Sequence, residues 1–215
     1  MARVRVRQHV NPLSYKYRTP IAIPDWNQVY QDLTLPIHLD IGCARGRFLT
    51  RMAGLYPEIN FLGSEIREAL VIEANEEKDR LGYTNLYFLF CNINVSLEDL
   101  LESLPEGKLK QVSIQFPDPW FKHRHSKRRV VQPELVNSLA RYLAPDGIVF
   151  LQSDVEAIAR EMTDRFAENP HFIRQHESQW LAENIFPVPT EREIATYNKG
   201  ENVYRSLFGL KNPRE

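Results

Sequence analysis

The segment IHLDIGCARG, residues 37–46, decides the fold class of this chain. It starts as a short, mainly apolar run and ends in a turn with small residues at Gly42, Ala44 and Gly46. The residues that follow, 47–55, have the pattern of a helix. A strand that enters a glycine-containing turn and then a helix is typical of α/β proteins that bind a nucleoside at the carboxyl ends of parallel strands.

Short apolar runs and helical stretches continue to alternate along the chain. We expect further strands at residues 60–66, 86–91, 112–116 and 148–152, and further helices at 68–81, 97–104, 134–143 and 155–166. Such alternation indicates parallel strands joined by helical crossovers. We therefore predict an α/β fold, a Rossmann-like doubly wound and mostly parallel sheet with helices on both faces. Two late apolar runs, 172–173 and 203–208, predict an antiparallel C-terminal edge.

Length and composition favour one domain. The chain has 215 residues, of which 43% are hydrophobic and 26% charged, as in ordinary globular proteins. Its start does not resemble a secretory signal, and no run approaches the ~18 apolar residues of a membrane span. The two cysteines, Cys43 and Cys91, do not have zinc spacing. We expect a cytoplasmic protein without membrane attachment or metal, with a basic, flexible arm at 1–24 and a single domain at 25–215.

The net charge of −1 conceals a segregation of charge along the sequence. Residues 1–24 contain five basic residues and no acid, residues 65–106 contain ten acids and three bases, and residues 107–129 contain seven bases and one acid. Blocks of one sign can bind a polyanion locally even when the whole chain is nearly neutral. The basic arm and the basic segment are therefore candidate contacts for nucleic acid, although solvated surface segments have the same composition.

Three strand ends supply a candidate nucleoside pocket. Asp40, Gly42 and Gly46 follow or end the first strand, Glu65 ends the second, and Asn92 follows the third. An acid after the second strand can accept hydrogen bonds from ribose hydroxyls, and Asn92 can pair with an adenine amino group. The glycine spacing is not the G-x-G-x-x-G of dinucleotide sites, and the carboxylate of Asp40 suits an ammonium or sulfonium group. These details favour S-adenosylmethionine over a dinucleotide.

The fourth strand leads into the segment FPDPW, residues 116–120, and then into a basic loop. Two prolines restrict the backbone around Asp118 and hold its carboxylate at the mouth of the sheet. Trp120 and Phe121 offer flat faces for stacking a base. The positive charge that could bind a tRNA backbone comes from Lys122, Arg124, Lys127, Arg128 and Arg129.

Taken together, these motifs resemble those of the bacterial single-subunit tRNA (guanine-N7)-methyltransferases, a family of class I S-adenosylmethionine-dependent enzymes. The resemblance runs from residue 36 to residue 208. The segments that carry it are DIGCARG at 40–46, GSE at 63–65, FPDPW at 116–120 with the basic loop, SD at 153–154 and TERE at 190–193. The chain departs from the family pattern at Asp40, Ala44 and Asn92, where the family usually has Glu, Gly and Asp.

The resemblance implies methyl transfer from S-adenosylmethionine, with S-adenosylhomocysteine as product, to N7 of a guanosine in tRNA, at position 46 in the variable loop. It assigns the catalytic carboxylate to Asp118 and cofactor contacts to Asp40, Glu65, Asn92 and Asp118. It places substrate contacts on Lys122, Asp154, Thr190, Glu191, Arg192 and Glu193. We expect tRNA as the partner, no obligate protein partner, and a monomer or homodimer.

Other interpretations of the same residues stay open at this point. Asp154 can also cap a helix, and Thr190 with Glu193 has the spacing of a capping box. The chain could methylate another RNA, a protein or a small molecule. An NAD-dependent oxidoreductase and a non-catalytic RNA-binding protein are the other classes, the former disfavoured by the glycine spacing.

Overall fold

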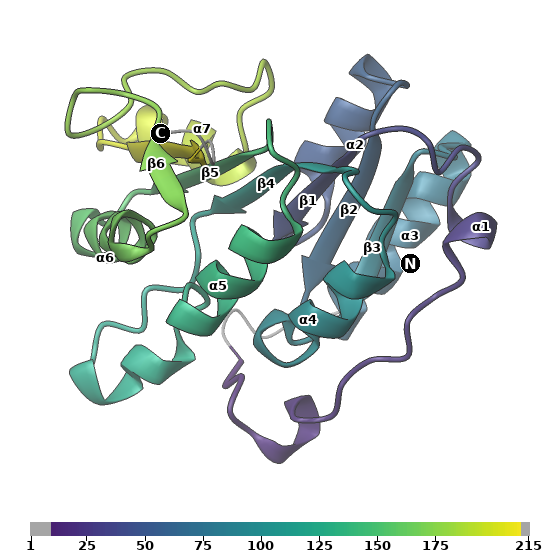
Figure 1. Ribbon diagram of the computed structural model, residues 1–215, viewed down its shortest axis with the longest axis horizontal. Helices are drawn as coiled ribbons and strands as arrows, with labels where there is room; N and C mark the ends of the chain where they lie inside the picture. Colours follow the sequence, from purple (N-terminus) through teal and green to yellow (C-terminus); the bar gives the residue numbers. More distant parts are fainter. Residues whose placement is uncertain (1–9, 212–215) are drawn as a thin grey trace.

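The computed structural model describes residues 10–211, which form one seven-stranded sheet with the order β3-β2-β1-β4-β5-β7-β6 (Figure 1). Strands β1 to β5 are parallel, β7 is antiparallel to β5, and β6 is antiparallel to β7. The predicted fold class and antiparallel edge are confirmed. The strands are β1 (Ile37–Ile41), β2 (Asn60–Glu65), β3 (Leu86–Phe90), β4 (Leu109–Gln115), β5 (Ile148–Ser153), β6 (Phe172–Arg174) and β7 (Tyr204–Leu210).

The helices agree with the expected pattern except in three places. They are α1 (Trp26–Val29), α2 (Arg47–Leu55), α3 (Glu68–Leu81), α4 (Ile93–Ser103), α5 (Pro133–Tyr142), α6 (Glu156–Glu168) and α7 (Glu191–Asn198), with 3-10 turns at Tyr15–Tyr17 and His123–Arg128. Helix α4 begins four residues before the prediction, because Ile93 continues the buried stripe formed by Leu97, Leu100 and Leu101. The short helices α1 and α7 were not predicted.

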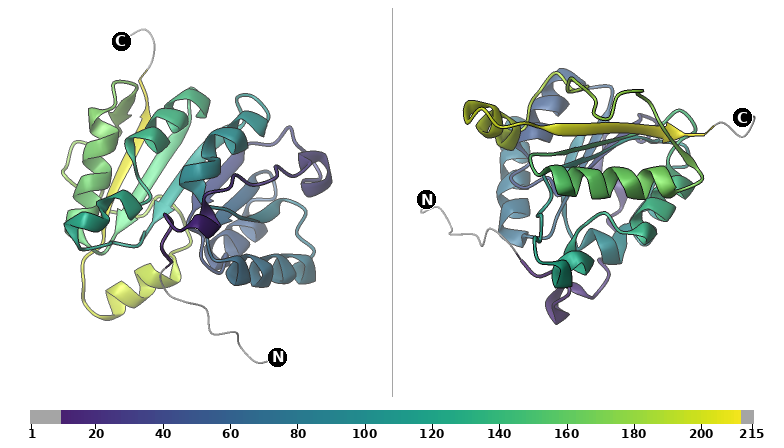
Figure 2. Two further views of the ribbon diagram at one scale, coloured as in Figure 1. Left: turned by 90° about the horizontal axis from the view of Figure 1, so that it is seen from below. Right: turned by 90° about the vertical axis from the view of Figure 1, so that its left-hand side faces the viewer.

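Helices cover both faces of the sheet (Figure 2), and a hydrophobic cluster lies on each face. One contains the buried side chains of α4, α5 and α6, together with Trp26 of α1. The other contains those of α2 and α3, together with Phe186 from the loop before α7. The buried parallel strands between these layers bring the carboxyl ends of β1 to β5 to one edge of the molecule, where sites form in such folds.

Strand β1 shows how the two faces differ. Ile37, Leu39 and Ile41 belong to the cluster on the α4 side. His38 and Asp40 alternate with them and lie on the other face, where the His38 ring stacks on Phe186 with centroids 5.0 Å apart. Burial lowers the pKa of His38 to about 3, so this imidazole is neutral. The face on the α2 side therefore combines an aromatic cluster with buried polar groups.

The segment 10–24 lies alongside α4 (purple in Figure 1). The Asn92 side-chain amide donates hydrogen bonds to the carbonyls of Pro12 at 3.0 Å and Tyr17 at 3.1 Å. Farther along, the Ile21 amide donates to Ser96 Oγ at 3.3 Å. Of the predicted basic arm, Arg3, Arg5 and Arg7 lie outside the described residues. Between residues 10 and 211, no helix has the length and apolarity required to cross a membrane.

Candidate active site

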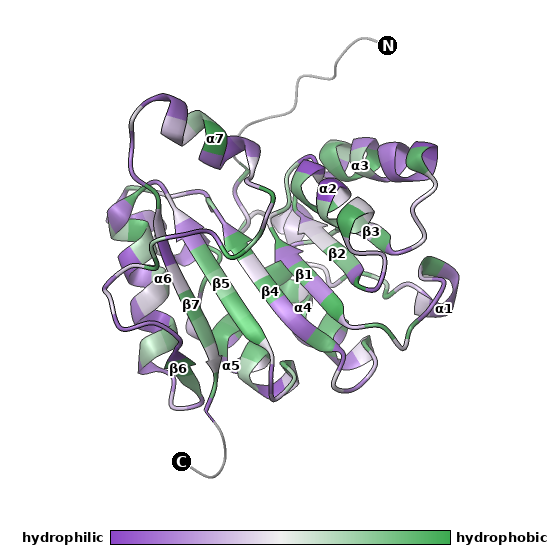
Figure 3. Cartoon of the chain, turned by 90° about the horizontal axis from the view of Figure 1, so that it is seen from above, coloured by the Kyte–Doolittle hydropathy of each residue, from purple (hydrophilic) through white to green (hydrophobic). Residues whose placement is uncertain are grey.

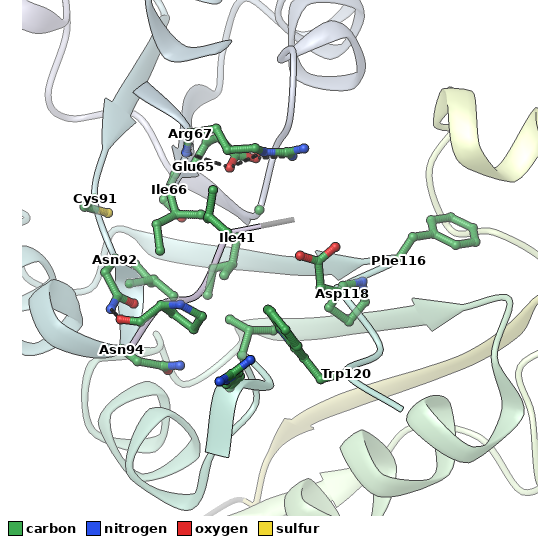
Figure 4. A pocket seen from close by; sticks show the side chains of 18 residues that line it. Ile41, Glu65, Ile66, Arg67, Cys91, Asn92, Asn94, Phe116, Asp118 and Trp120 are labelled. Carbon is green, nitrogen blue, oxygen red and sulfur yellow. Dashed lines mark hydrogen bonds and ion pairs between the residues drawn. The ribbon is translucent and has the colours of Figure 1, made fainter. Parts of the chain in front are cut away.

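A pocket opens at the carboxyl ends of the first four strands. It is lined by Gly42 after β1, Glu65 at the end of β2, Asn92 after β3 and Asp118 after β4. Its cavity volume is about 130 Å³, and its mouth is open to solvent. Figure 4 shows Glu65 and Asn92 on one side of the pocket and Asp118 on the other. The fold thus assembles four residues that the sequence places far apart.

The turn after β1 closes one end of the pocket through its unusual backbone. Gly42, Ala44 and Gly46 have positive φ angles of 83°, 52° and 69°. A Cβ added at Gly46 would lie 2.3 Å from the Phe88 ring, so the close approach of turn and strand requires glycine there. The Ala44 amide donates to Glu65 Oε2 at 3.0 Å. Ala44, where the family has glycine, therefore keeps the left-handed conformation with a methyl group.

Glu65 is held in place by Arg67. The carboxylate is 3% exposed and accepts hydrogen bonds from the Arg67 amide at 2.9 Å, from Nε at 2.9 Å and from Nη2 at 2.8 Å. With the Ala44 amide, these donors engage about all the lone pairs that a carboxylate offers. A hydroxyl-bearing ligand at Glu65 would compete with the Arg67 side chain. The sequence analysis did not single out Arg67, because an arginine two residues after an acid at a strand end is not a recognisable pattern.

Asn92 lies on the side of the pocket formed by β3. Both hydrogens of its side-chain amide are used by the carbonyls of Pro12 and Tyr17, so recognition of an adenine amino group would use Oδ1. Nearby, the buried Ser64 hydroxyl lines the pocket and has no hydrogen-bond partner among the described residues. A ligand with polar groups in this position would satisfy it.

Asp40 and Gly46 lie behind the pocket and are not among its lining residues. The buried Asp40 carboxylate accepts hydrogen bonds from Ser113 Oγ at 2.6 Å and Gln115 Nε2 at 3.2 Å. Burial raises the pKa of Asp40 to about 6, and the two hydrogen bonds partly oppose that effect. The negative charge at Asp40 is therefore poorly solvated, as expected of a group that favours a cationic partner.

Asp118 lies in a segment with a constrained backbone. The residues at its two ends, Phe116 and Trp120, have positive φ angles of 50° and 42°, which non-glycine residues rarely adopt. Arg129 stabilises the segment by donating to the carbonyls of Pro119 at 3.0 Å and Trp120 at 3.1 Å, and it also pairs with Glu161 of α6. Strained backbone of this kind is common at functional sites.

The basic loop divides into inward and outward side chains. Arg129 turns inward to the carbonyls and Glu161, and Arg128 lies over the Trp120 ring at 4.8 Å. Desolvation and then the nearby cations Arg128, Arg124 and Lys122 lower the pKa of His125. The exposed cations of the loop are Lys122, Arg124 and Lys127. Of the two aromatic residues proposed for base stacking, Phe121 is 75% exposed.

The segment 190–193 connects α7 to three different elements. Thr190 Oγ1 accepts from the Glu193 amide at 3.1 Å, which confirms the capping role of Thr190, while the Glu193 carboxylate pairs with Arg205 at 2.6 Å instead of completing a capping box. Arg192 pairs with Asp154 through Nε and Oδ2, 2.8 Å apart, and Glu191 pairs with Arg47. Asp154 does not cap α6, since the N-cap residue is Val155 and α6 has no side-chain capping hydrogen bond. These residues do not line the pocket.

Comparison with known proteins identifies the family. A family described as "Putative methyltransferase" matches residues 34–206. A tRNA (guanine-N(7)-)-methyltransferase from Microcystis aeruginosa is 72% identical over 211 residues, which cover 98% of this chain and 100% of that protein. The chain belongs to the tRNA (guanine-N7)-methyltransferase family. A member of this family from Synechocystis sp. is 61% identical, over 97% of this chain and 98% of its own length.

Solved structures of other methyltransferases share the fold of this family member. A precorrin-6y C5,15-methyltransferase from Geobacter metallireducens is 12% identical, with a TM-score of 0.54 over 82% of this chain and 80% of its own. PKMT2 from Rickettsia typhi, in complex with AdoHcy, is 13% identical, with a TM-score of 0.53 over 86% of this chain and 51% of its own. Among residues 10–211, no three His, Cys, Asp or Glu residues gather where they could hold a metal ion.

Proposed function

We infer that this chain transfers a methyl group from S-adenosylmethionine to N7 of a guanosine in tRNA. Near full-length identity to curated enzymes of this name supports the reaction. The structural observation that carries it is the position of Asp118, which lines the same pocket as the nucleoside-binding candidates Glu65 and Asn92. A carboxylate at this place can face both a bound donor and an incoming base.

The pocket fits S-adenosylmethionine by its polar groups. Glu65 would accept from the ribose hydroxyls in place of the Arg67 side chain, Asn92 Oδ1 would accept from the adenine amino group, and the Ser64 hydroxyl supplies a further polar contact. Asp40 would stabilise the positive charge at the methionine end, from behind the turn made by Gly42 and Gly46. When bound, this donor supplies a methyl group on a sulfonium and is released as S-adenosylhomocysteine.

Asp118 acts in this proposal by orientation and electrostatics. Guanine N7 has an in-plane lone pair at neutral pH, so no side chain has to remove a proton before the attack. The base becomes cationic as the methyl group is transferred, and a fixed carboxylate stabilises that developing charge. The constrained backbone around Asp118 keeps the carboxylate in position, so little reorganisation is needed during the reaction.

The tRNA would bind across the carboxyl ends of β4 and β5. Exposed cations at Lys122, Arg124 and Lys127 would contact phosphates, and Phe121 offers its exposed face to a base. We assign substrate contacts to Asp154 and to Thr190, Glu191 and Arg192, which the ion pairs of α7 hold near this edge. Glu193 is buried against Arg205, so we assign it the positioning of this segment in place of a direct contact with the base. This activity implies a cytoplasmic protein that needs no obligate protein partner, as a monomer or a homodimer.

The inference is tested by methylating unmodified tRNA with labelled S-adenosylmethionine and mapping the product by chemical cleavage at 7-methylguanosine. We expect a single modified guanosine, at position 46. Asp118→Asn should lower the single-turnover rate by about 100-fold, since the charge is lost with little change in shape. Asp99→Asn, an exposed isosteric change on α4, is the matched control. Label on a protein or a small molecule, or a near wild-type rate for Asp118→Asn, would contradict the assignment.

A further inference from the structure

A row of polar side chains crosses four strands on the α2 side of the sheet. It begins at Asp40 of β1, whose register partner is Ser113 of β4. Two residues farther along β4, Gln115 is the partner of Gln152 of β5, and Gln152 is the partner of Arg205 of β7. In Figure 3, β5 is hydrophobic along most of its length and becomes hydrophilic at the end nearest α7.

These side chains form one continuous chain of hydrogen bonds. Arg205 Nε donates to Gln152 Oε1 at 3.1 Å, Gln152 Nε2 donates to Gln115 Oε1 at 2.7 Å, and Gln115 Nε2 donates to Asp40 Oδ1 at 3.2 Å. Asp40, Gln152 and Arg205 are buried, and Gln115 is half-buried. The chain therefore runs inside the protein from the methionine end of the proposed donor site to β7.

The direction of every bond is fixed by the two ends of the row. A guanidinium only donates, so Arg205 must face the oxygen of the Gln152 amide. The amide nitrogen of Gln152 then faces Gln115, whose own nitrogen faces the carboxylate of Asp40. Reversing one amide would place two donors or two acceptors against each other, which is costly for buried groups. The row therefore has a single hydrogen-bonded arrangement.

At its other end the row holds Glu193 of α7. The Glu193 carboxylate is 2% exposed and accepts from Arg205 Nη2 at 2.6 Å, Gln152 Nε2 at 3.3 Å and Asn184 Nδ2 at 2.8 Å. Arg205 is itself 3% exposed and also bonds to the Tyr197 hydroxyl of α7. The position of α7, which carries the proposed substrate residues, is thereby tied to the same row as Asp40.

We propose that Gln115 and Gln152 are positioning residues that couple the donor end of the pocket at Asp40 to the substrate helix α7. The proposal rests on the proposed function, since it assumes that Asp40 serves the donor and α7 serves the tRNA. Neither glutamine touches the reacting groups. Each transmits the position of one charged group to the next, so that occupation of one site favours the geometry that the other site needs.

Burial makes a purely space-filling role for the row unfavourable. On the same face of the sheet, next to the row, the space is filled by His38 and the rings of Phe48, Phe61, Phe150 and Phe186. Apolar side chains there avoid the desolvation that buried polar groups require. Two glutamines between a buried carboxylate and a buried ion pair need a full set of partners, and the structure provides them. A fully satisfied network fixes the positions of its members relative to one another, and in this way the row can couple its two ends.

The coupling is measured as the change in affinity for S-adenosylhomocysteine when tRNA is bound. We expect saturating tRNA to tighten binding several-fold in the wild-type protein. In Gln152→Met and Gln115→Met, which keep approximate volume but remove the hydrogen bonds, the factor should fall to about one. Gln111→Met is the matched control, because Gln111 lies on the same face of β4 at the opposite end of the sheet and is half-buried.

A second variant and a ligand-free measurement separate positioning from simple destabilisation. Gln152→Glu keeps an acceptor for Arg205 but removes the Nε2 donor to both Gln115 and Glu193, so it interrupts the row without removing the contact with Arg205, and it also serves if Gln152→Met does not fold. Hydrogen exchange of the α7 amides should become faster in both Gln152 variants and remain unchanged in Gln111→Met. Retention of the wild-type coupling factor in these variants, or no effect of tRNA on wild-type affinity, would overturn the proposal. Because coupling is read from binding, a wild-type protein that forms no 7-methylguanosine would contradict the proposed function separately.

Discussion

Asp40 illustrates how one residue can disfavour folding and still serve a site. Its carboxylate is buried beside Ser113 and Gln115, and the nearby Glu65 carboxylate adds to the effect of burial in raising its pKa. The ordinary pKa of 3.8 rises to about 6 in the folded protein. The folded state therefore holds a proton more tightly than the unfolded state, and stability falls as the pH rises from 3.8 to about 6.

Replacing Asp40 by Asn should therefore stabilise the protein at neutral and alkaline pH. A shift of this size corresponds to roughly 3 kcal/mol of unfolding free energy. We expect urea denaturation near pH 8 to show Asp40→Asn more stable than wild type by up to that amount, with the difference disappearing below the ordinary pKa of 3.8, where Asp40 is protonated in both the folded and the unfolded state. Affinity for S-adenosylhomocysteine should fall in the same variant, because its ammonium loses a carboxylate partner. A stability difference independent of pH, with Asp99→Asn as control, would contradict this assignment.

Single residues also show the limit of local sequence patterns. The position of Asp118 between two prolines correctly predicted a carboxylate at the mouth of the sheet, because proline restricts its neighbours whatever the tertiary structure. Arg129, in contrast, was assigned to the tRNA backbone with the rest of the basic loop, and the structure turns it inward to Glu161. Composition cannot distinguish an inward from an outward arginine, since the partner is 32 residues away.

Among the elements, the parallel strands were predictable and α7 was not. Strand β1 and helices α2 and α3 have the bounds expected from apolar periodicity and from Gly82 after α3. Helix α7 has eight residues, and its sequence shows only the cap at Thr190. Its position depends on ion pairs with Asp154, Arg47 and Arg205, two of them with partners far along the chain. Contacts of this kind cannot be recognised from a short stretch of sequence.

The side-chain amide of Asn92 holds residues 12–17 at the start of α4 through two hydrogen bonds. Asn92→Asp should weaken this contact, because the NH2 group that donates to Pro12 and Tyr17 would become a carboxylate oxygen facing two carbonyls. We expect faster hydrogen exchange for residues 12–17 and a several-fold change in affinity for S-adenosylhomocysteine, since Pro12 also lines the pocket. The exposed pocket residue Asn94, changed to Asp, controls for added charge. Equal exchange in the two variants would show that the Asn92 amide does not hold the segment.

At the scale of the whole molecule, the near-neutral net charge is the sum of separate surfaces. The outward cations of the basic loop lie beside the pocket at the carboxyl ends of the strands. Many acids of α3 are paired locally, for example Glu77 with Arg80 and Glu73 with Arg45. A polyanion approaching the pocket therefore meets the basic loop, although the chain as a whole carries a charge of −1.

This arrangement makes tRNA binding sensitive to salt. The outward cations Arg124 and Lys127 should contribute to that sensitivity, and the inward Arg129 should not. Each phosphate contact contributes about 0.7 to 0.9 to the slope of log affinity against log salt concentration. Replacing both Arg124 and Lys127 by Gln should lower that slope by roughly 1.5 and weaken binding at low salt. Arg129→Lys should leave the slope unchanged and instead slow methyl transfer, because its guanidinium holds the backbone around Asp118.

The exposed Lys211, changed to Gln, is the control, since β7 carries it to the end of the sheet opposite the pocket. Filter binding of tRNA over a series of salt concentrations measures the slope, and an unchanged slope in Arg124→Gln/Lys127→Gln would remove the basic loop from the tRNA interface.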